Sequence, residues 1–303
     1  MDYRQFCSVV TIALASSLSA TAEERVEANV VYGMYSGTAL LMDVYLPAES
    51  KSNGHGLVYI NGSGWHAPLG YDATPLKPAR GTLVQSLAEA GFTVFTINHR
   101  AAPRFRYPAA IEDAQRAVRY IRHHASAYGI QSDRLGAVGG SSGGHLVSLL
   151  GVLDGKGRES ATDSIESESA KVQCVVALMA PSDLTEFGNA SGEGPVTSFL
   201  GMSGYYAARD RYPEVKALYR EASPITYVTP DDPPFLLIHG DGDEVVPVEQ
   251  SEILAAALEK AAVTHKLVIA EGAGHSRFFD PEYVSEIVSW LETHLVRAEA
   301  ASN

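Results

Sequence analysis

Short apolar runs recur along the chain, and longer segments with a helical pattern separate most of them. Six such runs occupy residues 57–60, 92–97, 135–138, 175–179, 235–238 and 266–270. Runs of this kind are typical of strands buried on both faces, and helical connections place neighbouring strands parallel. The pattern therefore predicts an α/β fold with a mostly parallel central sheet and helices on both faces.

Two further patterns add detail to this fold. Residues 26–32 and 39–46 alternate apolar and polar positions on either side of a Tyr-Ser-Gly-Thr turn, which predicts an antiparallel N-terminal hairpin. The best-specified helix lies between the second and third apolar runs and ends at Gly129. Its apolar residues are spaced three and four apart, at Ile111, Ala114, Val118, Ile121, Ala125 and Tyr128. This spacing gives one continuous apolar face.

The first residues differ in character from the rest of the chain. Residues 6–20 carry no charge but are too few to span a bilayer, and Ala20-Thr21-Ala22 has the form of a cleavage site. We therefore predict a signal peptide over residues 1–22, a secreted or periplasmic protein and no membrane span. Residues 23–303 show no internal repeat and are predicted to form a single domain. Within it, residues 183–229 hold five tyrosines and no long apolar period, which indicates a cap-like insertion.

Charge and cysteine content exclude several classes of protein. The chain has 36 acidic against 23 basic side chains, a net charge of −13, so a nucleic acid is not an expected partner. Two cysteines cannot cross-link a chain of 303 residues, and no cysteine-histidine spacing suggests zinc. We predict no metal and no cofactor, and the sequence indicates no oligomeric state.

A cluster of glycine and serine joins an apolar strand to an apolar helix in LGAVGGSSGGHLVSLL, residues 135–150. It contains Gly-x-Ser-x-Gly in two overlapping frames, one centred on Ser141 and the other on Ser142. A nucleophile elbow needs this context, because a strand ends there in a sharp turn between small residues. The helix that follows directs its N-terminal N–H groups at the same point, where an oxyanion would form. A glycine-rich turn without chemistry is the alternative.

A serine nucleophile needs a histidine base and a carboxylate that orients it. His275 lies in a glycine-containing loop after the last apolar run, and Asp243 lies in the loop after the run before it. The chain order Ser, Asp, His is that of α/β-hydrolases. Asp241 is the competing acid, but its position favours a turn-forming role.

The loop Asn61-Gly62-Ser63-Gly64-Trp65-His66 follows the first run and is short enough to expose backbone N–H groups. It predicts an oxyanion hole in which the N–H of Ser63 or Gly64 acts with the N–H of Ser142. Trp65 is the predicted substrate-binding residue, and aromatic residues of the 183–229 insertion could hold a sugar ring or a phenolic acyl group. Packing of the cap by the tyrosines of the insertion is an equally ordinary alternative. Three nearby histidines are expected to be structural rather than ligands: His66, His99 and His145.

Five stretches, spread over nearly the whole chain after residue 22, carry a resemblance to a known family. They are 30–32 with 43–47, 61–65, 107–113, 139–146, and 222–225 with the segment to Pro247. They resemble the carboxylesterases of the bifunctional feruloyl/acetyl xylan esterase-like group of α/β-hydrolases. The alignment with that family implies that Ser141 is the nucleophile, Ser142 the following donor, Asp243 the acid and His275 the base. That family usually reads His-Gly-Gly-Gly-Trp in its oxyanion loop, so Asn61 and Ser63 depart from it.

The resemblance implies a serine carboxylesterase that works through an acyl-enzyme intermediate. Its expected substrates are acetyl or feruloyl-type esters of carbohydrates, or other short-chain esters. Two other functions remain open. Serine peptidases related to prolyl oligopeptidase share the chain order of the three residues, and a non-catalytic binding protein could have the same fold.

Overall fold

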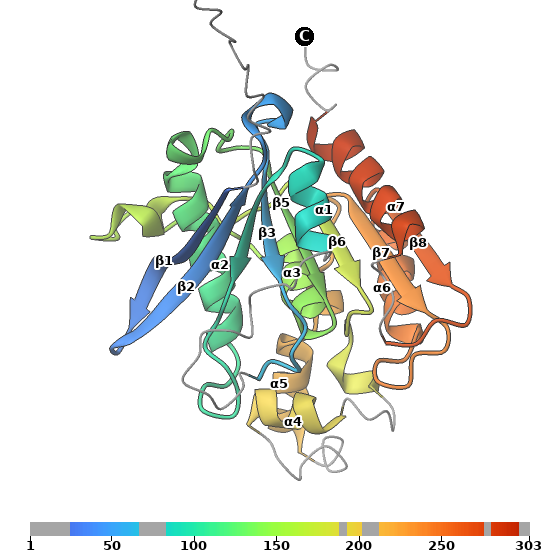
Figure 1. Cartoon of the computed structure of the whole chain (residues 1–303). Coiled ribbons are helices and arrows are strands. Elements are labelled where there is room, and N and C mark those ends of the chain that lie inside the picture. Colours follow the sequence, from blue (N-terminus) through green and yellow to red (C-terminus); the bar gives the residue numbers. More distant parts are fainter. Residues whose placement is uncertain (1–24, 67–82, 188–192, 202–211, 276–279, 297–303) are drawn as a thin grey trace, which may run out of the picture.

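The computed structural model describes residues 25–66, 83–187, 193–201, 212–275 and 280–296. An eight-stranded sheet forms its centre, in the order β1-β2-β4-β3-β5-β6-β7-β8 (Figure 1). The pairs β1–β2 and β2–β4 are antiparallel, and all later pairs are parallel. The predicted signal peptide, residues 1–22, lies outside the described residues and stays a prediction.

Each of the six apolar runs forms a strand, and the two alternating stretches pair as a hairpin. The strands are β1 (Arg25–Tyr35), β2 (Thr38–Leu46), β3 (Gly56–Ile60), β4 (Thr93–Ile97), β5 (Leu135–Gly140), β6 (Cys174–Leu178), β7 (Phe235–Gly240) and β8 (His265–Ala270). All residues of β3 to β7 are buried, whereas most of β1 at the sheet edge is not. The predicted mostly parallel sheet with its antiparallel hairpin is therefore confirmed.

Helices cover both faces of the sheet. Those on the faces are α1 (Leu83–Glu89), α2 (Ala109–His123), α3 (Ser142–Val152), α6 (Glu249–Lys260) and α7 (Pro281–Leu291). Helices α4 (Glu193–Leu200) and α5 (Pro213–Glu221) lie instead beyond the carboxyl ends of the strands (Figure 1). Residues of α1 and α7 pack in one buried apolar cluster, and residues of α2, α3 and α6 pack in a larger one. The two clusters are the two faces of the sheet, as predicted.

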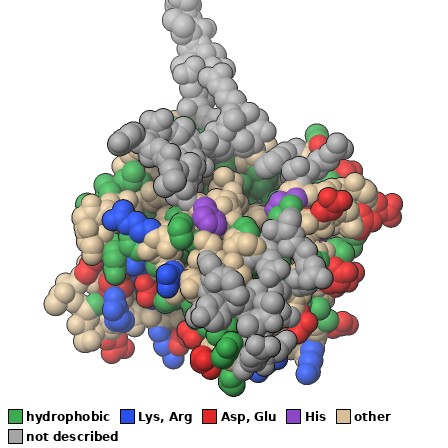
Figure 2. Space-filling model, turned by 90° about the horizontal axis from the view of Figure 1, so that it is seen from below, with side chains coloured by type: hydrophobic (Ala, Val, Ile, Leu, Met, Phe, Trp, Pro, Cys, Tyr) green, Lys and Arg blue, Asp and Glu red, His purple; other side chains and the backbone are tan. Residues whose placement is uncertain are grey.

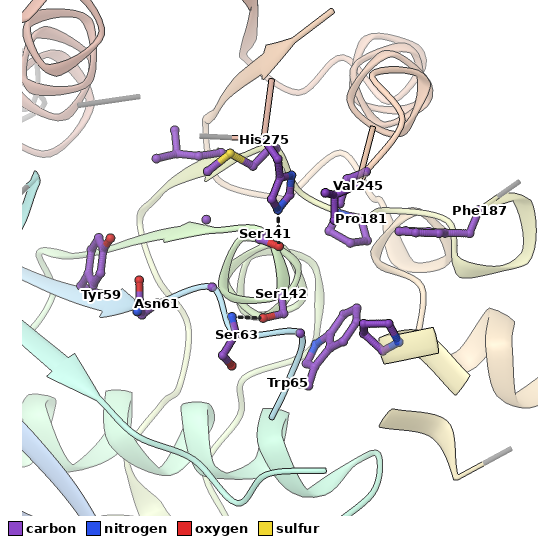
Figure 3. Close-up of a pocket in the computed structure, with 17 residues that line it drawn as sticks. Tyr59, Asn61, Ser63, Trp65, Ser141, Ser142, Pro181, Phe187, Val245 and His275 are labelled. Carbon is purple, nitrogen blue, oxygen red and sulfur yellow. Dashed lines mark hydrogen bonds between the residues drawn. The ribbon is translucent and has the colours of Figure 1, made fainter. Parts of the chain in front are cut away.

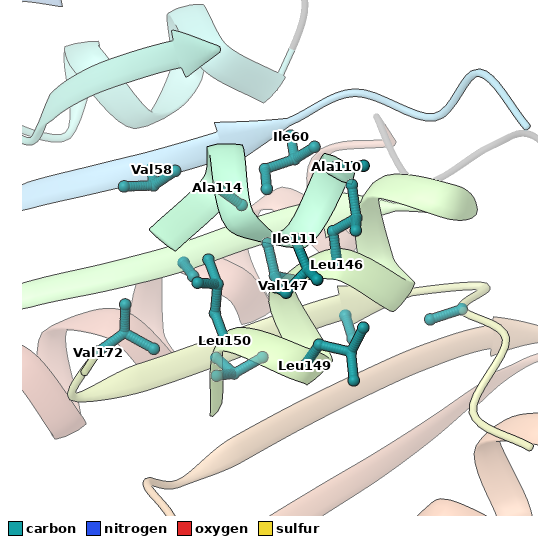
Figure 4. Packing of buried hydrophobic residues seen from close by; sticks show 14 of the residues in the cluster. Val58, Ile60, Ala110, Ile111, Ala114, Leu146, Val147, Leu149, Leu150 and Val172 are labelled. Carbon is teal, nitrogen blue, oxygen red and sulfur yellow. The ribbon is translucent and has the colours of Figure 1, made fainter. Parts of the chain in front are cut away.

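Side-chain alternation along the strands supplies both clusters. In β3, Val58 and Ile60 belong to the larger cluster, while Leu57 and Tyr59 belong to the smaller one. Figure 4 shows Val58 and Ile60 of the sheet beside side chains of α2 and α3. The two helices thus hold β3 and β5, whose ends carry the candidate site.

The predicted helix ends earlier in the structure than the sequence spacing indicated. The α-helix ends at His123, and Ala125–Tyr128 form a 3₁₀ turn before Gly129, which has a φ of 65°. The N–H of Gly129 donates to Ser126 and that of Ile130 to Ala125, which is the Schellman pattern. The sequence spacing did not distinguish this tighter turn from a helix, because Ala125 keeps the same buried face.

No helix in the described part of the chain is both long and apolar enough to cross a membrane.

Candidate active site

The predicted site residues all follow strands whose carboxyl ends lie at the same end of the sheet. Ser141 follows β5, Asp243 follows β7 and His275 follows β8, while the loop at residues 61–66 follows β3. Because these strands are parallel, their carboxyl ends all lie at one end of the sheet. Figure 2 views the molecule from that end, and histidine side chains reach its surface there.

Ser141 occupies a strained turn between β5 and α3. Its φ is 54° and its ψ is −125°, values that non-glycine residues rarely adopt. Its N–H donates to the carbonyl oxygen of Leu178 at 2.8 Å, which fixes the turn against β6. At Gly143 an added Cβ would lie 2.0 Å from the carbonyl oxygen of Ile60, so only glycine allows β3 and α3 to approach this closely.

We expect Gly143→Ala to lower the free energy of unfolding by at least about 2 kcal/mol, because backbone must move to admit the methyl group. Urea denaturation of both proteins measures the change. Gly194→Ala is the matched control: this glycine is also helical, but its added Cβ meets nothing within 4 Å. Equal stability of Gly143→Ala and the unmodified protein would contradict the close approach.

The structure brings three of the predicted residues into one hydrogen-bonded chain, of which Figure 3 shows the contact between Ser141 and His275. His275 Nδ1 lies 2.7 Å from Asp243 Oδ2, and His275 Nε2 lies 2.9 Å from Ser141 Oγ. Since a carboxylate only accepts, Nδ1 carries the proton and Nε2 accepts from the Ser141 hydroxyl. Ser142 Oγ instead accepts the N–H of Ser63 at 2.9 Å, so of the two serines it is Ser141 that contacts the histidine.

The carboxylate of Asp243 is fully buried and held from several sides. Oδ1 accepts the N–H of Val245 at 2.8 Å and that of Val246 at 2.9 Å. Oδ2 lies 3.3 Å from Nε2 of the buried His239, in addition to its bond from His275. Burial alone would raise the pKa of Asp243, but the hydrogen bonds from His239, His275 and the two backbone N–H groups lower it well below its usual value. The carboxylate is therefore ionised at neutral pH.

Asp241 has a different environment. It is exposed, and its Oδ1 accepts the N–H of Gly272 at 2.6 Å. This bond joins the loop after β7 to the loop after β8, as a turn-forming residue would. In this structure the acid that contacts His275 is Asp243.

The short loop after β3 lies against the start of α3. The N–H of Ser63 is taken up by Ser142 Oγ, and no hydrogen bond joins the N–H of Gly64 or Ser142 to another described residue. Both belong to residues that line the cavity beside Ser141. The N-terminus of α3 adds its positive dipole end there. The predicted oxyanion roles of Ser63, Gly64 and Ser142 stay predictions.

Trp65 is only 2% exposed and is fixed by its neighbours. Its ring stacks on Phe199 of α4 with centroids 4.6 Å apart, and its indole N–H donates to His145 Nδ1 at 3.2 Å. The other nitrogen of His145 donates to the carbonyl oxygen of Ala222 at 2.7 Å. Burial lowers the pKa of His145 to about 4, so the neutral ring that this geometry requires is present at neutral pH.

A cavity of about 450 Å³ opens above Ser141. Its lining is mostly apolar and includes Trp65, Met179, Pro181, Phe187, Pro195 and Val245. In Figure 3, Tyr59 and Asn61 lie on one side of Ser141, while Pro181, Phe187 and Val245 lie on the other. The cavity thus has one side with polar groups and one apolar side.

Among the described aromatic residues of the predicted 183–229 insertion, Phe187 lines the cavity and the tyrosines do not. Tyr212, Tyr219 and Tyr227, which the structure describes, do not line the cavity. Tyr219 is fully buried, and the hydroxyl of Tyr227 donates to the carbonyl oxygen of Glu221. The insertion contributes Phe187 and Pro195 instead. Tyr205 and Tyr206 lie outside the described residues.

The nearby histidines make structural hydrogen bonds. His66 Nδ1 donates to the carbonyl oxygen of Gly64 at 2.6 Å, and His66 Nε2 lies 3.0 Å from the hydroxyl of Ser198 in α4. His99 Nδ1 donates to the carbonyl oxygen of Arg100 at 3.0 Å. Within the described ranges, no group of three or more His, Cys, Asp or Glu side chains could hold a metal ion.

Sequence reasoning missed the contacts of His145 and His239. His145 lies one helical turn after Ser141, and His239 lies four residues before Asp243 at the end of the same strand. These spacings were the sequence signal that each histidine lies close to a predicted catalytic residue. The partners of the two rings, Trp65 and the buried carboxylate of Asp243, could be assigned only from the packed structure.

Comparison with known proteins assigns the chain to a family. The model of the BD-FAE family matches residues 42–258, well over half of the chain. The chain belongs to the BD-FAE family. The resemblance to bifunctional feruloyl/acetyl xylan esterase-like proteins is therefore confirmed, and the matched range includes Ser141 and Asp243 but ends before His275.

Individual relatives of this BD-FAE chain agree with the assignment. Esterase LipQ of Mycobacterium tuberculosis is 32% identical over 190 residues, 61% of this chain and 42% of that protein. Esterase LipC of the same organism is 30% identical over 254 residues, 82% of this chain and 59% of that protein. The chain thus spans about half the length of the curated relatives it matches.

A solved structure supports the same fold over a greater length. The truncated form of a carbohydrate esterase from gut microbiota is 29% identical, with a TM-score of 0.78. The match covers 91% of this chain and 98% of that chain. The predicted α/β-hydrolase fold is confirmed.

Proposed function

We propose that this BD-FAE protein is a serine carboxylesterase that hydrolyses short-chain esters, including acetyl or feruloyl-type esters of carbohydrates. The hydrogen-bonded chain of Ser141, His275 and Asp243 carries the proposal, because its Ser141 and His275 line a cavity of about 450 Å³. Family membership and the similarity to a carbohydrate esterase support it.

Acylation begins when Ser141 Oγ attacks the ester carbonyl carbon. His275 Nε2, at 2.9 Å, takes the hydroxyl proton, and Asp243 holds the resulting imidazolium through Nδ1. The negative charge on the former carbonyl oxygen is stabilised by the N–H groups of Ser142 and Gly64 and by the N-terminus of α3. As the intermediate collapses, His275 gives the proton to the departing alcohol, and the acyl group remains on Ser141.

Deacylation repeats the same steps with water. His275 removes a proton from a water molecule as it attacks the acyl carbon, then returns that proton to Ser141 Oγ. The carboxylic acid leaves, and the enzyme is restored. The apolar side of the cavity suits a short acyl or aromatic group, while Tyr59 and Asn61 suit a polar alcohol.

A substrate series tests this proposal. We expect hydrolysis of p-nitrophenyl acetate and butyrate, with kcat/KM falling as the acyl chain outgrows the cavity, and release of acetate from acetylated xylan or of ferulate from methyl ferulate. Peptide amides in the same series should remain intact. Faster cleavage of a peptide amide than of any ester would indicate a peptidase, and no turnover by the folded protein would indicate a binding protein.

A further inference from the structure

The side chain of Ser142 lies between the oxyanion loop and the cavity. Ser142 is 1% exposed and lines the cavity next to Ser141. Its Oγ accepts the N–H of Ser63 at 2.9 Å, so the loop and the helix start are joined at this atom (Figure 3). The backbone N–H of Ser63 is thereby occupied by a side chain of the same protein.

A hydroxyl group both accepts and donates, and only the accepting side of Ser142 Oγ is used here. Its proton has no acceptor among the described residues. A buried donor without an acceptor is unfavourable, so the proton turns toward space that an acceptor can enter. For Ser142 that space is the cavity, where the carbonyl oxygen of an ester attacked by Ser141 comes to the N-terminus of α3.

We infer that the Ser142 hydroxyl is itself an oxyanion donor, with its Oγ fixed by the N–H of Ser63. The inference rests on the proposed esterase function and extends it. In the tetrahedral intermediate, Ser142 donates to the oxyanion through its side-chain O–H as well as its backbone N–H. Ser63 acts through Ser142, because its N–H holds and polarises that hydroxyl. No bond forms to Ser142 Oγ, and its proton stays in place throughout.

The variant Ser142→Ala tests this directly, because it removes the hydroxyl and keeps the helix start. We expect kcat for p-nitrophenyl acetate to fall about 100-fold, with KM changed less than about threefold, since the donor acts on the transition state. Ser142→Thr keeps a hydroxyl and should retain most of the activity. If Ser142 Oγ only blocks the N–H of Ser63, alanine releases that donor, and an unchanged or increased kcat would overturn the inference.

Ser148→Ala is the matched control. Ser148 lies on the same helix, is equally buried and donates to the carbonyl oxygen of Gly144 at 2.8 Å, but it does not line the cavity. We expect its kcat to stay within about twofold of the unmodified protein. An equal loss of kcat in both variants would assign the effect of Ser142→Ala to packing of α3 and so overturn the inference.

An ethylboronic acid gives a readout that does not depend on turnover. Ser141 Oγ adds to the boron, its proton passes to His275, and the boron becomes a tetrahedral anion that resembles the intermediate. Calorimetry should show binding to Ser142→Ala weakened about as much as kcat, and equal affinity would overturn the inference. If the unmodified protein binds the boronic acid but hydrolyses no ester, the proposed function fails, while the two affinities still decide the role of Ser142.

Discussion

Ser141→Ala should reduce kcat for p-nitrophenyl acetate by about 10⁵-fold, because the variant has no oxygen to form the acyl-enzyme. The change removes only Oγ, whose contact in this structure is with His275 Nε2. Alanine keeps the Cβ and the backbone N–H that donates to the carbonyl oxygen of Leu178. The strained turn, with its φ of 54°, is therefore expected to persist. Steady-state kinetics and thermal unfolding of the two proteins measure both effects.

Covalent labelling provides the second measurement for Ser141. A fluorophosphonate should label the protein without substitution once, on the peptide that contains residues 139–145. It should leave Ser141→Ala unlabelled. The peptide also contains Ser142, so fragmentation must place the label on Ser141. A folded Ser141→Ala protein that keeps more than about a tenth of the activity would show that another residue is the nucleophile.

The sequence was sufficient to predict the sheet. Five of the six apolar runs form β3 to β7 and are buried throughout, so hydrophobicity alone marks these strands. The sixth run forms β8 at the sheet edge, where only Ala270 is buried. Strand ends were also readable, since Ser141, Asp243 and His275 each follow one. Parallel strands then bring these ends together whatever the connecting helices contain.

Neither the exact end of a helix nor the contacts between segments far apart in sequence could be predicted. The spacing at Ala125 is the same for a 3₁₀ turn as for a helix, because both bury that residue. The N–H of Ser63 meets Ser142 Oγ only because Gly143 allows β3 and α3 to approach. Within residues 183–229, Phe187 rather than a described tyrosine lines the cavity, since the packing of this segment decides which of its aromatic rings faces Ser141.

Asp243→Asn should lower kcat by about 10⁴-fold. The amide nitrogen can replace Oδ2 opposite His275 Nδ1, and an N–H there cannot accept, so the imidazole would carry its proton on Nε2. In that form His275 cannot accept the proton of Ser141. The variant also removes a buried charge that His239 and two backbone N–H groups contact, so its stability must be measured beside its kinetics.

Asp241→Asn separates a catalytic carboxylate from a structural one only two residues away. Asp241 is exposed and uses one oxygen to accept the N–H of Gly272, which the side-chain oxygen of asparagine can also accept. We expect kcat to change less than about threefold. If Asp241→Asn lost as much activity as predicted for Asp243→Asn, and Asp243→Asn stayed active, the acid would be misassigned. Because both variants remove one negative charge beside the same loop, a difference between them cannot come from net charge.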